Sequence, residues 1–188
     1  MIDIHYLWAT PFFELKLNYP NNVIVDFTHK LMKENESVVK SNRGGWQSES
    51  FNSSSLAHQE IVEPLFKNIY DVVGQLPIPI NKITLEQAWI NVNVKNDWNM
   101  IHQHGHQYDL SGTYYVKTPK NCGNFIFRDP RPAAIGHTFW NLNFDKGEEF
   151  RVQPYEGLLL LFPPYLEHIV EPNKTDEERI SISFDLKL

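Results

Sequence analysis

The chain reads Ala88-Trp89-Ile90-Asn91-Val92-Asn93-Val94-Lys95 at the point where its sequence pattern changes. Aliphatic residues occupy every second position of this stretch, which is the period of a β-strand whose two faces meet different surroundings. Later runs share this character, being short, rich in β-branched or aromatic residues and bounded by Pro, Gly or Asn. They cover residues 111–117, 124–128, 157–162 and 179–186. The second part of the chain is therefore predicted to be a β-rich core.

The first 80 residues have a different pattern. Phe13, Leu15 and Leu17 alternate with charged or polar residues and predict one early strand. A first helix is predicted to start at Asn21 or Asn22, because an asparagine side chain can cap a helix N-terminus. A second helix is predicted to end near Val73, and the Ser-, Asn- and Gly-rich stretch before it is predicted to be a long loop at 40–55.

Helices followed by many short strands are typical of an α+β chain in which the helices pack on one sheet of a β-sandwich or jelly roll. We find no internal repeat and no linker, so we expect one domain over residues 1–188. In this division residues 1–80 are a mainly helical flank and residues 81–188 form the jelly-roll core.

Composition narrows the functional classes. The chain has 188 residues, of which 41% are hydrophobic and 21% charged, and this is typical of a globular domain. Its 17 basic and 23 acidic residues give a net charge of -6, which disfavours nucleic acid and anionic membranes as partners. The single cysteine, Cys122, excludes an internal disulfide and a cysteine-based zinc site.

The termini and apolar runs indicate where the protein is found. Residues 1–6 do not show the basic segment followed by an apolar run that is typical of a secretory signal. The longest strongly apolar run, 157–162, is far shorter than a membrane span. We therefore expect a soluble, cytoplasmic protein. The sequence carries no indication of an oligomeric state.

Three of the eight histidines fall within five residues, in Ile101-His102-Gln103-His104-Gly105-His106. Residues two apart on a strand point to the same side, so His102 and His104, or His104 and His106, can hold one metal ion between them. Imidazole ligands suit Fe, Zn, Cu or Ni rather than Mg or Ca. A distal candidate ligand is His168, which follows an apolar strand and a double proline.

After the histidine cluster and His168, a third candidate part of the site begins eleven residues further on, at Arg179. Arg179, Ser181 and Ser183 share one face of a predicted strand. A guanidinium fork with a neighbouring hydroxyl is suited to binding a carboxylate through two hydrogen bonds. The same alternation is also typical of a plain solvent-exposed face, so the functional interpretation depends on the histidines and Arg179 together.

At this point the chain resembles the Fe(II)- and 2-oxoglutarate-dependent oxygenases, and most closely a small group of them from bacteria and phages. Ordered motifs over some 180 residues carry the resemblance. They are Leu7-Trp8-Ala9-Thr10-Pro11, Trp89-Ile90-Asn91, Asn96-Asp97-Trp98, Leu110 to Val116, Phe127-Arg128-Asp129-Pro130-Arg131, Glu156 to His168 and Arg179 to Phe184.

The resemblance implies a double-stranded β-helix (jelly roll) and an oxidation that uses Fe(II), 2-oxoglutarate and O2. The reaction would decarboxylate 2-oxoglutarate to succinate while an unactivated C–H bond is hydroxylated. His102, His104 and His168 would bind the iron and serve the catalysis. Arg179 would bind the far carboxylate of 2-oxoglutarate, and the assisting residues would be Ser181, Tyr115, and Asn91 or Asn93.

One position departs from the wider superfamily. The usual metal site there has two histidines and one carboxylate, and His104 stands where the carboxylate is expected. Three ligand sets are compatible with this sequence: three histidines, a site in which Asp109 supplies the acid, or a site in which His106 replaces His102. The small group itself tends to have His-x-His, which favours the three-histidine set.

Two other functions compete with the oxygenase. A cupin-type metalloenzyme without 2-oxoglutarate fits the order of His102, His104 and Asp109, but it lacks the expected turn glycines and leaves Arg179 without a role. A jelly-roll binding module without catalysis would bind no iron. The sequence does not identify the substrate, which we expect to be a small molecule or a peptidyl group.

Overall fold

The structure is a computed structural model that describes residues 9–52, 54, 56–131 and 149–188. Its elements include two helices, α1 (Asn21–Glu34) and α2 (Leu56–Val73). The strands are β1 (Phe13–Lys16), β2 (Asn42–Arg43), β3 (Trp46–Gln47), β4 (Thr84–Asn93), β5 (Trp98–His102), β6 (Leu110–Lys117), β7 (Phe125–Arg128), β8 (Glu149–Val152), β9 (Leu158–Phe162), β10 (His168–Val170) and β11 (Arg179–Lys187).

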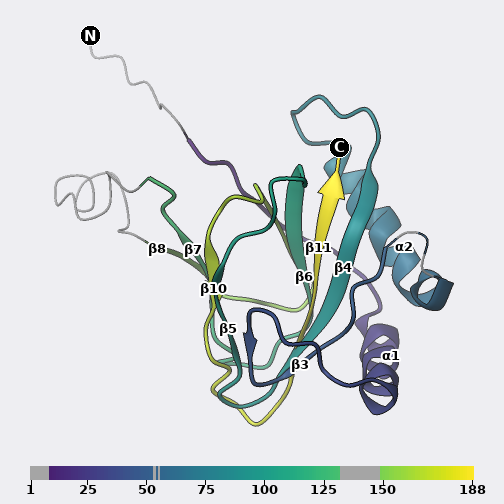
Figure 1. The fold of residues 1–188 in the computed structure, drawn as a ribbon, viewed down its shortest axis with the longest axis vertical. Helices are drawn as coiled ribbons and strands as arrows, with labels where there is room; N and C mark the ends of the chain where they lie inside the picture. The colour runs from purple at the N-terminus through teal and green to yellow at the C-terminus, as the bar shows by residue number, and fades with distance from the viewer. Residues whose placement is uncertain (1–8, 53, 55, 132–148) are drawn as a thin grey trace.

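The strands form two sheets that lie face to face (Figure 1). The larger sheet has the order β1-β9-β6-β11-β4-β3, and the smaller has the order β2-β5-β10-β7-β8. Every pairing between named strands is antiparallel. Strands that are hydrogen-bonded to each other in a sheet are far apart in the sequence, because the chain passes back and forth between the two sheets. This connectivity is expected of a jelly roll.

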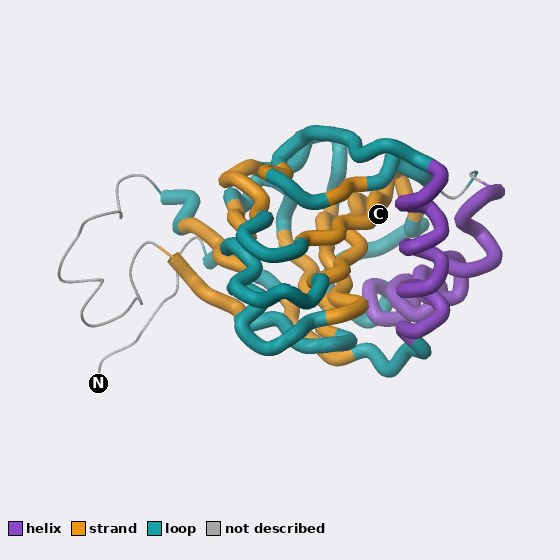
Figure 2. Tube along the Cα trace, turned by 90° about the horizontal axis from the view of Figure 1, so that it is seen from below, coloured by secondary structure: helices purple, strands orange, loops and turns teal. Residues whose placement is uncertain are grey.

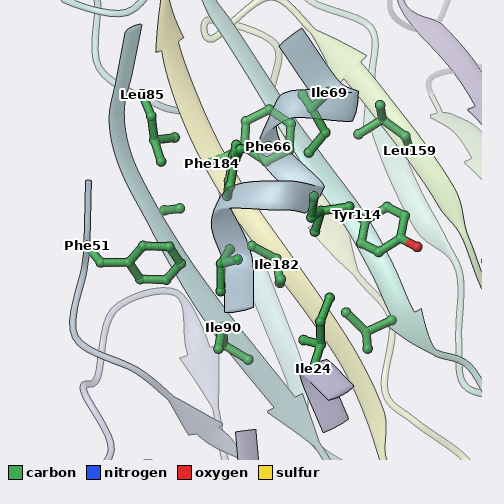
Figure 3. Packing of buried hydrophobic residues seen from close by; sticks show 14 of the residues in the cluster. Ile24, Phe51, Phe66, Ile69, Leu85, Ile90, Tyr114, Leu159, Ile182 and Phe184 are labelled. Atoms are coloured by element: carbon green, nitrogen blue, oxygen red, sulfur yellow. The ribbon is translucent and has the colours of Figure 1, made fainter. Parts of the chain in front are cut away.

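Both helices lie on one side of the strands, against the outer face of the larger sheet (Figure 2). Even-numbered residues of β11 face them, because side chains alternate across a strand. Phe184 stacks edge-on against Phe66 of α2, with ring centroids 5.4 Å apart. Figure 3 shows this cluster, in which the apolar residues of α1, α2 and the sheet exclude water together. The predicted packing of helices on one sheet is confirmed.

A second apolar cluster fills one part of the space between the sheets, around Phe125, Phe127 and Phe162. Strand β9 contributes to both clusters and is buried on both faces. This explains why the sequence at 158–162 is a continuous apolar run instead of an alternating one.

Several sequence predictions differ from the structure. The predicted early strand is confirmed as β1, but the predicted cap of α1 is wrong. Pro20 occupies the N-cap position without a side-chain hydrogen bond, and the Asn21 side chain instead accepts a hydrogen bond from the buried Tyr114 hydroxyl at 2.7 Å. The predicted loop at 40–55 contains β2 and β3, so the first 80 residues also contribute strands to both sheets.

Strands β5, β8 and β10 were missed because they are short or only partly buried. Among the described residues, neither helix combines the length and apolar character that crossing a membrane requires. The opening motif Leu7 to Pro11 lies partly outside the described residues.

Candidate metal centre

Three histidines from two segments of the chain, at the end of β5 and the start of β10, lie close together between the sheets. His102 ends β5, His168 begins β10, and the two residues are direct partners in the antiparallel pairing of these strands. His104 lies two residues beyond β5, where its backbone N–H donates to the carbonyl of Pro164 at 2.8 Å. One nitrogen from each of the three rings lies within 4.8 Å of the other two, which is close enough for a single metal ion to reach them all.

The Nδ1 atom of each ring already has a hydrogen-bond partner. It contacts the Met100 carbonyl in His102 at 2.8 Å and the Leu166 carbonyl in His168 at 2.9 Å. In His104 it contacts Oδ1 of Asp185 at 2.5 Å. Carbonyl and carboxylate oxygens only accept, so Nδ1 carries the hydrogen in each ring and the lone pair of Nε2 remains for a metal.

Burial keeps two of these rings in the neutral form that binds metal. His168 is 3% exposed, and its pKa lies well below the ordinary value of 6.5 because burial disfavours the charged ring and His102 and His104 lie close. Burial also lowers the pKa of His102, against the opposing effect of its bond to the Met100 carbonyl. Both imidazoles therefore stay neutral below the pH at which an exposed histidine is protonated.

Aromatic rings line the inner side of the cluster. Phe125 stacks on His168 with ring centroids 5.1 Å apart and an interplanar angle of 13°, and the Phe162 ring lies 4.9 Å from His168. Trp89 stands beside His104 at 5.5 Å. These rings keep water away from the histidines, which strengthens any electrostatic interaction inside the site.

The two alternative ligands from the sequence lie apart from this cluster. His106 is exposed and is not one of the three grouped histidines. Asp109 is also exposed, and its carboxylate accepts hydrogen bonds from Lys187 Nζ at 3.1 Å and from the backbone N–H of Leu188 at 3.0 Å. These two bonds hold the Asp109 carboxylate against the C-terminal strand.

A narrow polar pocket connects His102 and His168 with the inner face of the larger sheet. Its walls include Asn91, Asn93, Tyr115 and Ser181, the residues expected from the sequence to assist cosubstrate binding. The odd-numbered residues of β11 face inward here, so the polar face that also fitted solvent exposure is buried between the sheets. Ser41, Asn99 and Thr113 also line this pocket, although no motif in the sequence marks them.

Arg179 is 1% exposed at the start of β11. Its Nη1 donates to the backbone carbonyls of Cys122 and Glu171. Its Nε and Nη2 atoms are buried and have no hydrogen-bond partner among the described residues. These two N–H groups lie on one edge of the guanidinium, which is the edge that binds a carboxylate through two parallel hydrogen bonds.

Polar groups beside Arg179 support the same chemistry. Burial raises the pKa of the Tyr115 phenol above its ordinary 10, against the opposing effect of the Arg179 charge, so the hydroxyl stays a hydrogen-bond donor at neutral pH. Asn91 donates to the Ser183 hydroxyl at 3.2 Å, and its Oδ1 atom is buried without a partner in the part of the chain described. Unsatisfied buried polar atoms are costly, so their presence in Asn91 and Arg179, on the paired strands β4 and β11, indicates a binding site.

Asp185 is a further residue of the site that was not recognised in the sequence. Asp185 continues the inward face of Arg179, Ser181 and Ser183 by one further step of two, and it contacts His104 directly. The alternation along β11 was a signal that could have identified it.

Comparisons with known proteins agree with this geometry. A family described as "Putative 2OG-Fe(II) oxygenase" matches residues 87–185, slightly more than half of the chain. This segment contains the three histidines, Arg179 and most of both sheets. No curated protein matches the chain in sequence.

Solved structures share the fold. A prolyl-4-hydroxylase from Pseudomonas putida has a TM-score of 0.62 at 12% identity, with 96% of this chain and 94% of that chain covered. The viral collagen prolyl hydroxylase of Paramecium Bursaria Chlorella virus-1, in complex with 2OG, has a TM-score of 0.63 at 12% identity, covering 93% of this chain and 94% of that one. An oxidoreductase of the 2OG-Fe(II) oxygenase family from Burkholderia pseudomallei has a TM-score of 0.67 at 13% identity, covering 94% and 85%. The predicted double-stranded β-helix is therefore confirmed.

Proposed function

Because the chain belongs to the 2OG-Fe(II) oxygenase family, whose cofactors are Fe(II) and 2-oxoglutarate, we propose that it hydroxylates an unactivated C–H bond. In this reaction 2-oxoglutarate, O2 and the substrate R–H give succinate, CO2 and R–OH, with one oxygen atom entering succinate and the other entering the product. Bound iron supplies the oxygen activation that protein side chains cannot perform.

The observation that carries the proposal is the open edge of Arg179. Among the described residues the Arg179 guanidinium bonds only backbone carbonyls, which is costly for a buried charge, and a dicarboxylic cosubstrate would supply a carboxylate partner. His102 and His168 line the pocket that also contains Tyr115 and Ser181, and together with His104 they fit the site of a metal that would bind the 2-oxo acid end. A cupin-type enzyme without 2-oxoglutarate would have no use for this edge.

The remaining pocket residues have roles within the proposal. Tyr115 and Ser181 would donate hydroxyl hydrogens to the carboxylate held by Arg179. Asn91 and Asn93 would position the other end of the cosubstrate with their amides. The space open to water is about 20 Å³, so the lining side chains must shift to admit a five-carbon diacid.

The residues that would bind the iron are His102, His104 and His168. These residues fit an iron ion because each imidazole has its Nδ1 atom in a hydrogen bond and its Nε2 atom free to bind metal. An aromatic ring also packs against His168. Imidazole ligands of this kind suit Fe(II). The carboxylate expected in the wider superfamily is absent from the described cluster, and Asp109 and His106 remain the less favoured alternative ligands.

The substrate would be peptidyl or a small molecule. Structures with the same fold include a prolyl hydroxylase in complex with a peptide fragment and the protein HygX with hygromycin B bound. A net charge of -6 disfavours nucleic acid. Trp89, half-buried beside His104, would form part of the substrate wall.

The test is formation of succinate from 2-oxoglutarate with Fe(II) and O2, measured over a panel that includes prolyl peptides, free amino acids and hygromycin B. We expect slow turnover alone and stimulation by one member of the panel. Thr28→Ala is a control for general destabilisation, because its buried hydroxyl bonds only the Ile24 carbonyl in α1, and it should behave as the unchanged protein. No 2-oxoglutarate consumption and no 2-oxoglutarate binding to the Fe(II)-loaded protein would refute the proposal.

A further inference from the structure

Asp185 is a fully buried carboxylate in contact with the histidine cluster. Its Oδ1 accepts hydrogen bonds from His104 Nδ1 at 2.5 Å and from the Ser111 hydroxyl at 2.5 Å. Its Oδ2 accepts from the Gln87 side-chain amide at 2.7 Å. Its exposed fraction is 0%, and no lysine or arginine pairs with it among the described residues.

Strand register determines this arrangement. Asp185 of β11 is the direct partner of Gln87 on β4 and of Ser111 on β6, so the three side chains share the inward face of the sheet. The sheet is packed against α1 and α2 on its other face. Gln87 and Ser111 therefore fix both carboxylate oxygens from the two sides of the strand, and the carboxylate can hold His104 in one orientation.

We infer that Asp185 is a positioning residue that holds His104 as a metal ligand and supplies the negative charge that the cluster itself lacks. The inference rests on the proposed function, since it concerns the metal of that site. Asp185 is not one of the grouped candidate ligands, and it acts on the site through its bond to His104.

Two of the three rings are oriented by backbone carbonyls, which carry no net charge. Three neutral imidazoles leave the double charge of a divalent ion uncompensated in a largely buried site. A carboxylate one hydrogen bond behind His104 offsets part of that charge and makes the imidazole a stronger donor to the metal. Asp185 thus supplies, through the His104 ring, the negative charge that a carboxylate ligand would supply directly in the position of His104.

The test is the affinity of the metal-free protein for Co(II), titrated anaerobically and followed by the visible absorption of the bound ion. Asp185→Ala should weaken binding by about 10- to 100-fold and change the absorption spectrum, because outer-sphere partners of ligating histidines typically contribute this much. Asp185→Asn keeps an oxygen that can accept from His104, and it should recover part of the loss. Ser111→Ala removes one bond to Asp185 and should cause a smaller loss.

Two further measurements separate positioning from general stability. Urea unfolding of the metal-free variants measures the structural cost, and Thr28→Ala gives the effect of losing a buried hydrogen bond far from the site. If Asp185→Ala does not fold, Asp185→Asn and Ser111→Ala carry the test.

Co(II) affinities and spectra of the folded Asp185 and Ser111 variants that equal those of the unchanged protein would overturn the inference and leave the proposed function intact. If the unchanged protein itself binds neither Co(II) nor Fe(II), the proposed function fails, and the inference fails with it.

Discussion

Arg179 offers the sharpest test of cosubstrate binding. Replacing it with Met keeps an unbranched side chain in the buried position and removes the guanidinium edge formed by Nε and Nη2. Replacing it with Lys keeps a positive charge and loses the two parallel donors. We expect the affinity for 2-oxoglutarate to fall in both variants, and to fall further in Arg179→Met.

The expected loss of 2-oxoglutarate affinity follows from the burial of Arg179. Removing one partner of a buried, hydrogen-bonded charge pair costs about 2–5 kcal/mol of binding free energy. Every 1.4 kcal/mol is about tenfold in affinity, so Arg179→Met should weaken 2-oxoglutarate binding by about 30- to 4,000-fold. Arg179 is 1% exposed, so solvent should compensate little of the loss.

The assay is anaerobic titration of the Fe(II)-loaded protein with 2-oxoglutarate and, separately, with 2-oxobutanoate. The second compound keeps the 2-oxo acid and lacks the distal carboxylate. The affinity of Arg179→Met for 2-oxoglutarate should approach the affinity of the unchanged protein for 2-oxobutanoate, and its affinity for 2-oxobutanoate should change little.

Controls cover the structural role of Arg179. Its Nη1 bonds to the Cys122 and Glu171 carbonyls are lost in Arg179→Met, so urea unfolding is measured alongside binding. Iron affinity should stay unchanged, because the histidines keep their own partners. Equal 2-oxoglutarate affinity in Arg179→Met and the unchanged protein would refute this role of Arg179.

Three further predictions concern the metal site and the packing. His168→Ala should abolish iron binding at stoichiometric concentrations, because it removes the buried ligand from β10. Iron binding is measured by calorimetry, and full occupancy of the variant would contradict the placement of the site. The pKa of His168 is lowered by burial, so the unfolded chain takes up its proton at higher pH than the folded protein does. Stability of the metal-free protein should therefore be full above about pH 6.5 and fall below it, by up to about 1.4 kcal/mol per pH unit for each such histidine. Urea unfolding between pH 7 and pH 5 should show a shallower fall for His168→Ala, and an equal fall would argue against this origin. Gly112→Ala should lower the free energy of unfolding by about 1–3 kcal/mol. The added methyl group would lie 2.3 Å from the Phe184 ring and 2.9 Å from the Leu160 carbonyl. An unchanged urea midpoint would count against this clash.

Local patterns in the sequence were sufficient for much of the fold. The alternation at 88–95 and 179–186 predicted β4 and β11, because neighbouring side chains on a strand face opposite sides whatever the rest of the chain does. The same local argument grouped Arg179, Ser181 and Ser183 on one face. It could not say whether that face meets solvent or a second sheet, since burial depends on what packs against the strand.

Short strands and caps were decided by their partners. Strand β10 is three residues long and exists because it pairs with both β5 and β7. The Asn21 side chain makes no capping bond in its own helix and instead accepts a hydrogen bond from the Tyr114 hydroxyl, 93 positions away. Helix-capping propensities are weak compared with satisfying a buried hydroxyl, so tertiary contacts override them.

The sequence by itself determined the residue types of the site: His102, His104 and His168 as candidate metal ligands, and Arg179 as a candidate carboxylate binder. Tertiary structure alone decided that Asp185 bonds His104, 81 positions away, while the exposed Asp109 is held by Lys187. The reason is physical. The period of a strand is fixed within a few residues, whereas the partner of a side chain across a sheet is fixed by strand order and register, which the whole chain determines by packing.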